Sequence, residues 1–394
     1  MKILTLTTLF PNERQPIHAV FVKNRIKALS KLCEVKVVAP VPLAFPLKFL
    51  SKKYRMFSDI PSHEIQDGIE VFHPRYLVTP KFGRSLYGFM YFLSIFRFMA
   101  NLREQYDFDL IDVHWAYPDG FAGVLLAKAF GKPVTITVRG SDINEYTKLP
   151  LRRRIIAYAL KKADRVIAVS KDLGDKVAKL GVNRSKIKVI PNGVDIDKFY
   201  PMDKDKARKI LKLPQDKKII LSVGRLSYPK RFDHLIESVN TLKKGKHYDL
   251  LLLIVGEGEH RPKLERQIRE LGLDGYVRLI GSRPNEELVY WYNAADIFCL
   301  ASSNEGWPNV IFESLACGTP VVAYSVGGVP EIICSEEYGI LVEDQNPAML
   351  ADALLGSLTQ IWDEDKILEY ARGNTWDDVA RKVYSTFLSI GELE

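Results

Sequence analysis

The sequence predicts an α/β protein made of two doubly wound domains. At 394 residues, 47% of them apolar, the chain is longer than one ordinary hydrophobic core requires. Short β-branched runs alternate with helical patterns in both halves, which is typical of parallel sheets covered by helices on both faces. A turn-rich stretch at residues 189–201 breaks the alternation, and we place the domain linker there.

The first domain is expected at residues 1–195. Each predicted strand is a short apolar run that a helical pattern separates from the next strand. These strands are expected at residues 3–7, 35–39, 69–74, 110–114, 134–138 and 166–169. Together they predict one Rossmann-like sheet of parallel strands.

The second domain is expected at residues 196–374, where the same alternation starts again. Its strands are expected at residues 219–224, 250–255, 277–280, 297–300, 320–323 and 339–342. The last segment, residues 375–394, has helical apolar spacing and is expected to pack back on the first domain. Two such domains facing each other leave a central cleft at the carboxyl ends of their strands, where open α/β sheets bind ligands.

Cysteine usage and hydropathy predict a cytoplasmic protein. The four cysteines, Cys33, Cys299, Cys317 and Cys334, lie far apart in apolar contexts, so we expect reduced core thiols and neither disulfides nor a zinc site. The N-terminal segment lacks a signal-peptide cleavage pattern, and the longest apolar stretch, residues 86–96, is too short to span a bilayer.

The charge is distributed unevenly along the chain. Residues 1–200 hold 33 Lys and Arg against 18 Asp and Glu, a net +15, whereas residues 201–394 hold 23 against 30, a net −7. Residues 48–57 and 81–99 mix cations with aromatic and aliphatic side chains. This mixture fits peripheral contact with an anionic membrane, on the inner face of the cytoplasmic membrane, and it equally fits a helix with a solvated basic face. No nucleic-acid motif accompanies the charge, so nucleic acid is not an expected partner.

One segment with two glutamates carries most of the functional information. It begins Glu305, Gly306, Trp307, Pro308, Asn309, Val310 and continues to Glu313. Pro308 suits the first position of a helix of about ten residues that carries Glu313. Backbone N–H groups near Gly306, Trp307 and Asn309, together with the positive end of the helix dipole, predict a phosphate site. The flanking carboxylates suit hydroxyl groups, so the ligand is expected to join hydroxyl-rich rings through a phosphate bridge.

A basic loop is expected at the same sheet edge. Gly224, Arg225 and Lys230 follow the first strand of the second domain, and two cations there can neutralise a diphosphate. Because negative charge grows on a departing diphosphate, that attraction favours the transition state. Gly256 starts a tight turn after the next strand. Neither domain has the Gly-x-Gly-x-x-Gly fingerprint of a dinucleotide site, which disfavours a nicotinamide or flavin enzyme.

Polar residues also follow strands of the first domain. His114 ends one predicted strand, and Arg139 and Asp142 follow the next. His114 either contacts a reacting sugar or acceptor, or is a satisfied structural residue. The Asp-x-Asp pairs of the chain lack further ligands and suit helix caps and solvated faces, so no metal cofactor is expected.

With these residues assembled, the chain resembles a family 4 glycosyltransferase (GT4) of the GT-B fold, a retaining class that uses nucleotide sugars. The resemblance covers nearly the whole chain and is strongest over residues 223–330. Its motifs there are Gly224-Arg225 with Lys230, the Glu305 and Glu313 pair, and Ser325-Val-Gly-Gly-Val-Pro-Glu331.

The resemblance implies a role for each matching residue. Arg225 and Lys230 would hold the diphosphate, Glu313 would bond the ribose, and Glu305 with the following amides would contact the donor sugar. His114 matches a histidine near the reacting centre. In such retaining enzymes the leaving phosphate itself assists the acceptor hydroxyl, so no dedicated protein base is implied.

Two positions depart from the family pattern. Ala19 stands in the loop after the first strand, where a glycine is expected, and this puts close contact with the donor phosphate there in question. Arg139 replaces a histidine in the segment Arg139-Gly-Ser-Asp142, and a permanent cation there would suit an acidic acceptor.

The resulting hypothesis is a hexosyltransferase. It would move a hexosyl unit from a nucleotide diphosphate sugar to a glycan or lipid-linked acceptor, in cell-surface polysaccharide or glycolipid synthesis. Two alternatives stay open: a nucleotide-sugar epimerase of the same architecture, and a catalytically silent sugar-nucleotide sensor.

Overall fold

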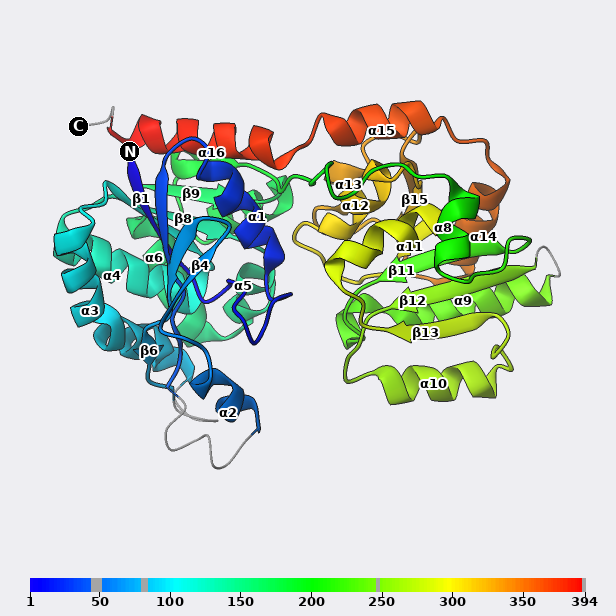
Figure 1. Cartoon of the computed structure of the whole chain (residues 1–394), viewed down its shortest axis with the longest axis horizontal. Helices are drawn as coiled ribbons and strands as arrows, with labels where there is room; N and C mark the ends of the chain where they lie inside the picture. The colour runs from blue at the N-terminus through cyan, green and yellow to red at the C-terminus, as the bar shows by residue number, and fades with distance from the viewer. Residues whose placement is uncertain (44–51, 79–83, 246–248, 392–394) are drawn as a thin grey trace. The chain divides into compact units, whose positions relative to one another are not determined.

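The computed structural model describes residues 1–43, 52–78, 84–245 and 249–391. The chain divides into two compact units (Figure 1). Unit 1 comprises Met1–Asn192 and Trp376–Glu394, and unit 2 comprises Gly193–Thr375. The chain thus crosses from unit 1 to unit 2 within the turn-rich stretch and returns just before its last helix.

Unit 1 is built on a sheet of eight strands within the described residues, in the order β10-β9-β8-β7-β1-β2-β5-β4. Neighbouring strands are parallel, except that β4 runs antiparallel to β5. The strands are β1 (Lys2–Leu6), β2 (Glu34–Val38), β4 (His63–Gln66), β5 (Ile69–Phe72), β7 (Leu110–His114), β8 (Val134–Val138), β9 (Arg165–Ala168) and β10 (Ile187–Val189). A separate parallel pair joins β3 (Val41–Pro42) to β6 (Arg75–Tyr76).

The six strands expected in this unit are present, with ends shifted by at most two residues. The expectation of a wholly parallel sheet is wrong at β4. The sequence did not predict this edge strand or β10 at the other edge, because both contain polar and charged residues and are partly exposed to solvent. An edge strand needs no continuous apolar run, so it lacks the signal that marks a central parallel strand.

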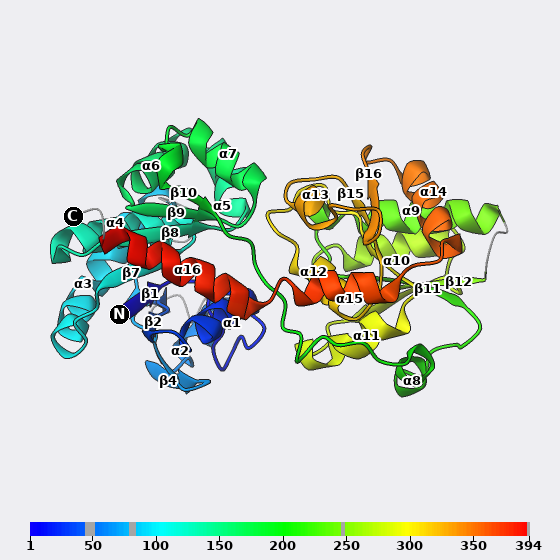
Figure 2. The same ribbon diagram turned by 90° about the horizontal axis from the view of Figure 1, so that it is seen from above.

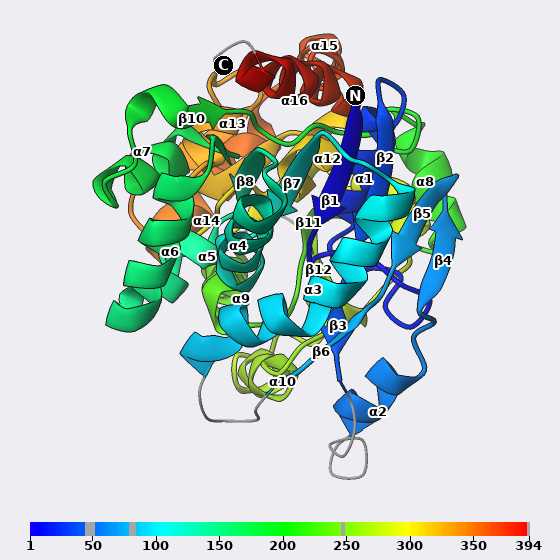
Figure 3. The same ribbon diagram turned by 90° about the vertical axis from the view of Figure 1, so that its left-hand side faces the viewer.

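Helices cover both faces of the unit 1 sheet. On one face α1 (Val20–Leu29) and α16 (Trp376–Gly391) bury Ile26, Val383 and Phe387 with Val37 of β2. Figure 2 shows α16 next to α1, and Figure 3 shows α3, α4 and α6 over the other face. The remaining helices of the unit are α2 (Lys52–Ser58), α3 (Tyr87–Gln105), α4 (Phe121–Phe130), α5 (Ser141–Asn144), α6 (Pro150–Lys162) and α7 (Lys171–Lys179).

Unit 2 is built on a sheet of six parallel strands within the described residues, in the order β13-β12-β11-β14-β15-β16. The strands are β11 (Lys218–Val223), β12 (Leu250–Val255), β13 (Val277–Gly281), β14 (Ile297–Leu300), β15 (Val321–Tyr324) and β16 (Gly339–Val342). All six strands expected from the sequence are therefore present here. Their buried residues alternate between two cores, as Ile219 and Leu221 face one and Ile220 faces the other.

Each core of unit 2 is closed by its own helices. The first contains residues of α8 (Lys204–Ile210), α11 (Leu288–Ala294), α12 (Asn309–Ala316), α13 (Val329–Ile332) and α15 (Glu364–Arg372). The second contains residues of α9 (Phe232–Lys244), α10 (Arg261–Glu270) and α14 (Pro347–Thr359). Both layers are visible in Figure 1.

Two local expectations need correction. Helix α12 begins at Asn309 and has eight residues, because Pro308 keeps an extended ψ of 100° and stands before the helix. Cys334 is exposed, so it is not a core thiol, although all four cysteines are unpaired thiols. Within the described ranges, no helix combines the length and the apolar character needed to cross a bilayer.

Candidate active site

In unit 2, two loops meet at the carboxyl ends of β11 and β12. The N–H of Gly224 donates to Val255 O at 2.9 Å, and Gly256 follows with φ +147°. A Cβ on Gly256 would lie 1.9 Å from Gly224 O. Only glycine allows both this backbone conformation and this approach, so the two loops are fixed against each other.

Lys230 and Glu305 form an ion pair at this sheet edge. Lys230 ends a single turn, η6 (Tyr228–Lys230), and its Nζ lies 2.5 Å from Glu305 Oε1. The Glu305 side chain is only 12% exposed. The N–H of Ser303 donates to Pro229 O at 2.8 Å, so the two loops are also joined through their backbones. Two motifs 75 positions apart in sequence thus form one site.

A glycine of the Ser325–Glu331 motif supports Glu305 from behind. Gly327 has φ +53°, and a Cβ there would lie 1.9 Å from Glu305 O. The sequence singled out this motif only by resemblance. Its structural contribution is to let the backbone of the 325–331 loop pack directly on the backbone of Glu305.

Arg225 lies at the same edge but has a different partner. Its side chain is 74% exposed, and its Nη2 donates to Glu259 Oε2 at 3.0 Å. Glu259 belongs to the turn that starts at Gly256. The structure therefore brings Lys230 to Glu305, whereas Arg225 is held by an exposed carboxylate of the neighbouring loop.

The loop from Gly306 to Asn309 leads from Glu305 into α12. In the part of the chain that the structure describes, the backbone N–H groups of Gly306 and Trp307 donate to no backbone acceptor. The Trp307 ring stacks on Phe312 with 6.0 Å between ring centres, and its buried indole N–H has no partner among the described residues. Donors of this kind, followed by Val310 in the first turn of α12, suit an anion or a sugar hydroxyl.

Glu313 lies one turn further along α12, where Tyr292 donates its hydroxyl proton to Glu313 Oε2 at 2.8 Å. Burial raises the pKa of the Glu313 carboxyl to about 7, and the bond from Tyr292 and the charge of Lys198 only partly oppose that rise. Near neutral pH this carboxyl can therefore either accept a hydrogen bond from a ligand hydroxyl or donate one to it.

In unit 1, His114 is fully buried at the end of β7. Its Nε2 lies 3.0 Å from Asp112 Oδ2, and its Nδ1 lies 2.6 Å from Arg139 Nη2. Because a guanidinium can only donate, Nδ1 is the acceptor and Nε2 carries the proton. Burial lowers the pKa of His114 to about 3, so the ring is neutral at physiological pH. Both ring nitrogens are engaged by protein groups in this structure.

Arg139 is also buried and bonded within unit 1. Besides His114, it donates from Nη1 to Asn192 Oδ1 at 2.7 Å, and its guanidinium lies 5.2 Å from the centre of the Phe21 ring. Burial lowers its pKa to about 9, so the side chain stays charged at neutral pH. Arg139, which the sequence analysis considered as a partner for an acidic acceptor, thus binds neighbouring residues of the chain instead.

Asp142 organises the loops around these residues. Its carboxylate accepts hydrogen bonds from the backbone N–H groups of Ala116, Arg139 and Gly140 at 3.0, 3.1 and 2.8 Å. Burial nevertheless raises the pKa of Asp142 above its ordinary value. In this structure Asp142 is a buried cap that ties the loop after β8 to the loop after β7.

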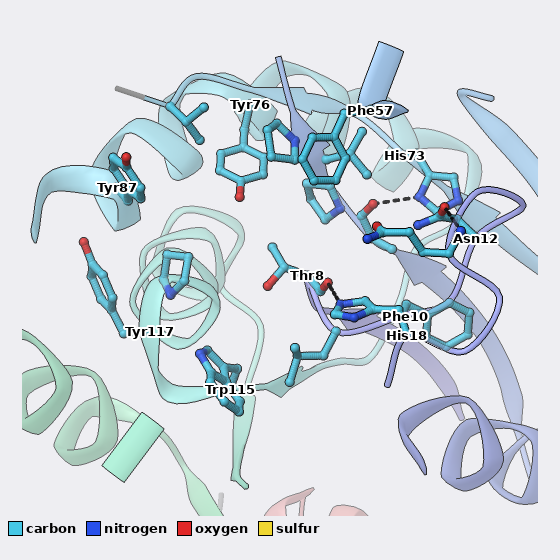
Figure 4. Close-up of a pocket in the computed structure, with 18 of the residues that line it drawn as sticks. Thr8, Phe10, Asn12, His18, Phe57, His73, Tyr76, Tyr87, Trp115 and Tyr117 are labelled. Carbon is cyan, nitrogen blue, oxygen red and sulfur yellow. Dashed lines mark hydrogen bonds between the residues drawn. The ribbon is translucent and has the colours of Figure 1, made fainter. Parts of the chain in front are cut away.

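A cavity of about 630 Å³ opens in unit 1 at the carboxyl edge of the sheet (Figure 4). Its lining comes from the loops after β1, β2, β5 and β7, with contributions from α2, η4 (Tyr146–Lys148) and α6. Many of the lining side chains are aromatic: Phe10, Phe57, Tyr76, Tyr87, Trp115, Tyr117 and Tyr146. A cavity at this edge with such walls is a typical ligand site.

The polar groups of the cavity are partly bonded to the chain. His73 bonds Ala39 O through Nδ1 and Glu64 through Nε2, at 2.8 and 2.6 Å. His18 lies 3.3 Å from Thr8 O, and burial lowers its pKa. The sequence analysis singled out no residue of η4 or α6, which supply Tyr146 and Arg152 to the lining.

Ala19 takes the backbone conformation of the glycine that the sequence lacks. It stands immediately before α1 with φ 50° and ψ 41°, in the left-handed region. An alanine there costs about 1–2 kcal/mol relative to a right-handed conformation. The turn is therefore made despite the substitution.

No group of three or more His, Cys, Asp and Glu side chains suited to a metal is found among the described residues.

Comparison with known proteins identifies the family. Residues 203–373 match the family described as "Glycosyl transferases group 1", and residues 18–198 match "Glycosyltransferase Family 4". The putative teichuronic acid biosynthesis glycosyltransferase TuaC of Bacillus subtilis is 30% identical over 368 residues, which are 92% of this chain and 90% of TuaC. A D-inositol 3-phosphate glycosyltransferase of Corynebacterium efficiens is 33% identical over 308 residues, 72% of each chain.

Solved structures show the same fold at low identity. Sucrose-phosphate synthase of Thermosynechococcus elongatus superposes with a TM-score of 0.81 and 20% identity over the whole of both chains. HepE of Anabaena, solved in complex with UDP and glucose, gives a TM-score of 0.73 and 20% identity over 99% of this chain and 100% of HepE. The chain belongs to the group 1 and family 4 glycosyltransferases and has their GT-B fold.

Proposed function

We propose that this glycosyltransferase is a retaining hexosyltransferase. It moves a hexosyl unit from a nucleotide diphosphate sugar to a glycan or lipid-linked acceptor in cell-surface polysaccharide or glycolipid synthesis. The observation that carries the proposal is the Lys230–Glu305 pair at the sheet edge of unit 2, beside the N-terminal end of α12. The biosynthetic role in TuaC's name and the UDP and glucose in HepE's title support it.

The donor occupies the loops of unit 2. Lys230 and Arg225 neutralise the diphosphate, and their attraction grows as the leaving group gains charge. Glu313 bonds the ribose, since its carboxyl lies on α12 beside Tyr292 and can accept or donate a hydrogen bond. Glu305 and the N–H groups of Gly306 and Trp307 contact the donor sugar. The leaving phosphate assists the acceptor hydroxyl on the same face, which retains the anomeric configuration.

The acceptor occupies unit 1. Its cavity of about 630 Å³ is large enough for a monosaccharide, and aromatic walls suit the apolar faces of a sugar ring. His114 has a positioning role, because its two ring nitrogens bond Asp112 and Arg139 and so hold these side chains in place.

Helix α3 provides the contact with an anionic membrane. Tyr91, Ile95 and Met99 face the core, whereas Phe89 and Leu93 on the opposite face are 50% and 57% exposed. Exposed apolar side chains at helical spacing suit the acyl boundary of a membrane surface. Lys48 and Lys81, which the sequence joined to this hypothesis, lie outside the described residues.

A donor screen tests the proposal. We expect one of the UDP-, GDP- or ADP-sugars to raise the melting temperature, because a ligand at 100 times its Kd adds about 2.7 kcal/mol of stability. The stabilising donor is then incubated with glycan and lipid-linked acceptors, and the anomer of the product is read by NMR. Conversion of donor alone into an epimer would favour the epimerase. Donor binding with no turnover on any acceptor would favour the sensor.

A further inference from the structure

Among its described lining residues, the cavity of unit 1 has one permanent cation and no carboxylate. Arg152, from α6, is the single Lys or Arg among the described residues that line it, and none of these residues is Asp or Glu. The two histidines of the lining do not add to this charge, because His73 is already bonded to Glu64 and burial favours neutral His18. A ligand bound here therefore meets the permanent charge of Arg152 in a partly enclosed space.

The rings of two tyrosines lie close to the Arg152 guanidinium. The guanidinium carbon lies 5.1 Å from the centre of the Tyr146 ring and 5.9 Å from that of the Tyr117 ring. Trp115 meets Tyr146 edge-on with 6.0 Å between ring centres, which braces this wall of the cavity. Cation–π contacts of this kind restrain a guanidinium, whose N–H groups are suited to bind an oxyanion.

Arg152 has a donor that the chain does not satisfy. Its Nε is buried, and within the described residues no acceptor bonds it. The Nε atoms of Arg25, Arg139 and Arg165 also lack a partner, so what sets Arg152 apart is its place in the wall of the cavity. Arg139, the other arginine considered for this role, donates to His114 and Asn192 instead.

We infer that Arg152 binds an oxyanion, a phosphate or a carboxylate, carried by the acceptor. The sugar or lipid part next to that anion lies against the aromatic walls, among which Figure 4 shows Trp115, Tyr117 and Tyr87. The inference rests on the proposed function, because it takes the cavity as the acceptor site. It makes an anionic acceptor the preferred substrate class and Arg152 the residue that selects it.

Binding of three glucose derivatives to the full chain tests the inference. Methyl α-D-glucoside is neutral, methyl α-D-glucuronide carries a carboxylate, and methyl α-D-glucoside 6-phosphate carries a phosphate. Affinities are measured by ligand-observed NMR for the wild type, Arg152→Gln, Arg152→Lys and Arg154→Gln. Arg154 is the matched control, since it lies on α6, is exposed and does not line the cavity.

We expect at least one anionic probe to bind about tenfold to a hundredfold more tightly than the neutral probe, as a charge-assisted hydrogen bond provides. Arg152→Gln removes that preference, Arg152→Lys retains part of it, and Arg154→Gln keeps it whole. Which anion gains more distinguishes a phosphate-bearing from a uronate-bearing acceptor.

Equal affinity of the three probes for the wild type, or no measurable binding of any, would overturn the inference. So would anion binding that Arg152→Gln leaves intact, which would place the anion elsewhere. Thermal stabilisation by nucleotide sugars is measured on the same variants. If the donor stabilises them all but the anion preference is absent, the inference fails while the proposed donor site stands; if no donor binds, the proposed function fails.

Discussion

Replacing Lys230 by alanine tests the donor half of the site most directly. Lys230 Nζ lies 2.5 Å from Glu305 Oε1, and the two side chains are 26% and 12% exposed. A charge in such a place interacts with a second charge 4 Å away by about 4 kcal/mol of gross Coulomb energy at an effective dielectric of about 20. Removing one contact made in the transition state costs about 2.7–4 kcal/mol of activation free energy, or a hundredfold to a thousandfold in rate.

We therefore expect kcat/KM of Lys230→Ala to fall by about a hundredfold. Most of the loss should appear in kcat, because the charge on the leaving diphosphate is greater in the transition state than in the bound donor. The assay is the initial rate of nucleoside diphosphate release at varied donor concentration and saturating acceptor. Lys230→Arg keeps a cation at the position and should recover part of the activity.

The chain supplies a matched control for this variant. Lys366 pairs with Glu337 at the same distance of 2.5 Å, but the two side chains are 53% and 48% exposed. Since exposed pairs contribute little, Lys366→Ala should change neither the rate nor the melting temperature appreciably. The reasoning is refuted if Lys230→Ala retains activity within about threefold of the wild type, or if Lys366→Ala loses as much.

Three further predictions concern the pKa of Glu313, the support of Glu305 and the membrane contact. Because burial raises the pKa of Glu313 to about 7 from its ordinary value of 4.5, the folded chain keeps a proton that the unfolded chain loses, and stability falls as pH rises between these values. In urea unfolding, Glu313→Gln should therefore be more stable than the wild type by about 1–3 kcal/mol at pH 8 and equally stable at pH 4. Equal stability of the two proteins at both pH values would contradict a raised pKa of Glu313. Gly327→Ala should lose at least about 2 kcal/mol of stability and most of the activity, because the added Cβ would collide with the backbone of Glu305. The control Gly356→Ala, which has open space around it in α14, should gain about 0.5–1 kcal/mol in thermal melts. A Gly327→Ala variant as active as the wild type would show that Glu305 does not need this glycine behind it. Leu93→Glu should reduce sedimentation with anionic vesicles, while Leu388→Glu, on exposed α16 surface, should not; unchanged sedimentation would argue against α3 as the contact.

The sequence predicted the strands well because most of them are central and parallel. A strand such as β12 (Leu250–Val255) is buried on both faces, so it must be a continuous apolar run that stands out from its surroundings. The edge strands β4 and β10 carry no such requirement and were not predicted. Helix α12 was predicted, but with its start one residue too early. The φ of Pro308 suits a helix, whereas its observed ψ does not.

The sequence predicted that the candidate site residues of unit 2 lie at one sheet edge, but it did not predict which of them pair. Both Lys230 and Glu305 follow strands, and the ends of parallel strands meet at one sheet edge. That Lys230 bonds Glu305 while Arg225 bonds Glu259 depends on loop conformations fixed by Gly256 and Gly327. Each of these glycines lets its backbone pack closely against the backbone of another loop, and a single sequence does not show which glycines do so.

The sequence by itself determined the fold class, the two-unit organisation and the resemblance to the glycosyltransferase family, because apolar periodicity and short motifs after strands are local properties of the chain. Only the tertiary structure decided which of two arginines lines the cavity of unit 1. Nothing in the sequence separates Arg139 from Arg152, but Arg139 is buried and donates to His114 and Asn192, whereas Arg152 lines the cavity of unit 1. Partners and burial arise from contacts between residues distant in sequence, so the chain must be folded before the two arginines can be told apart.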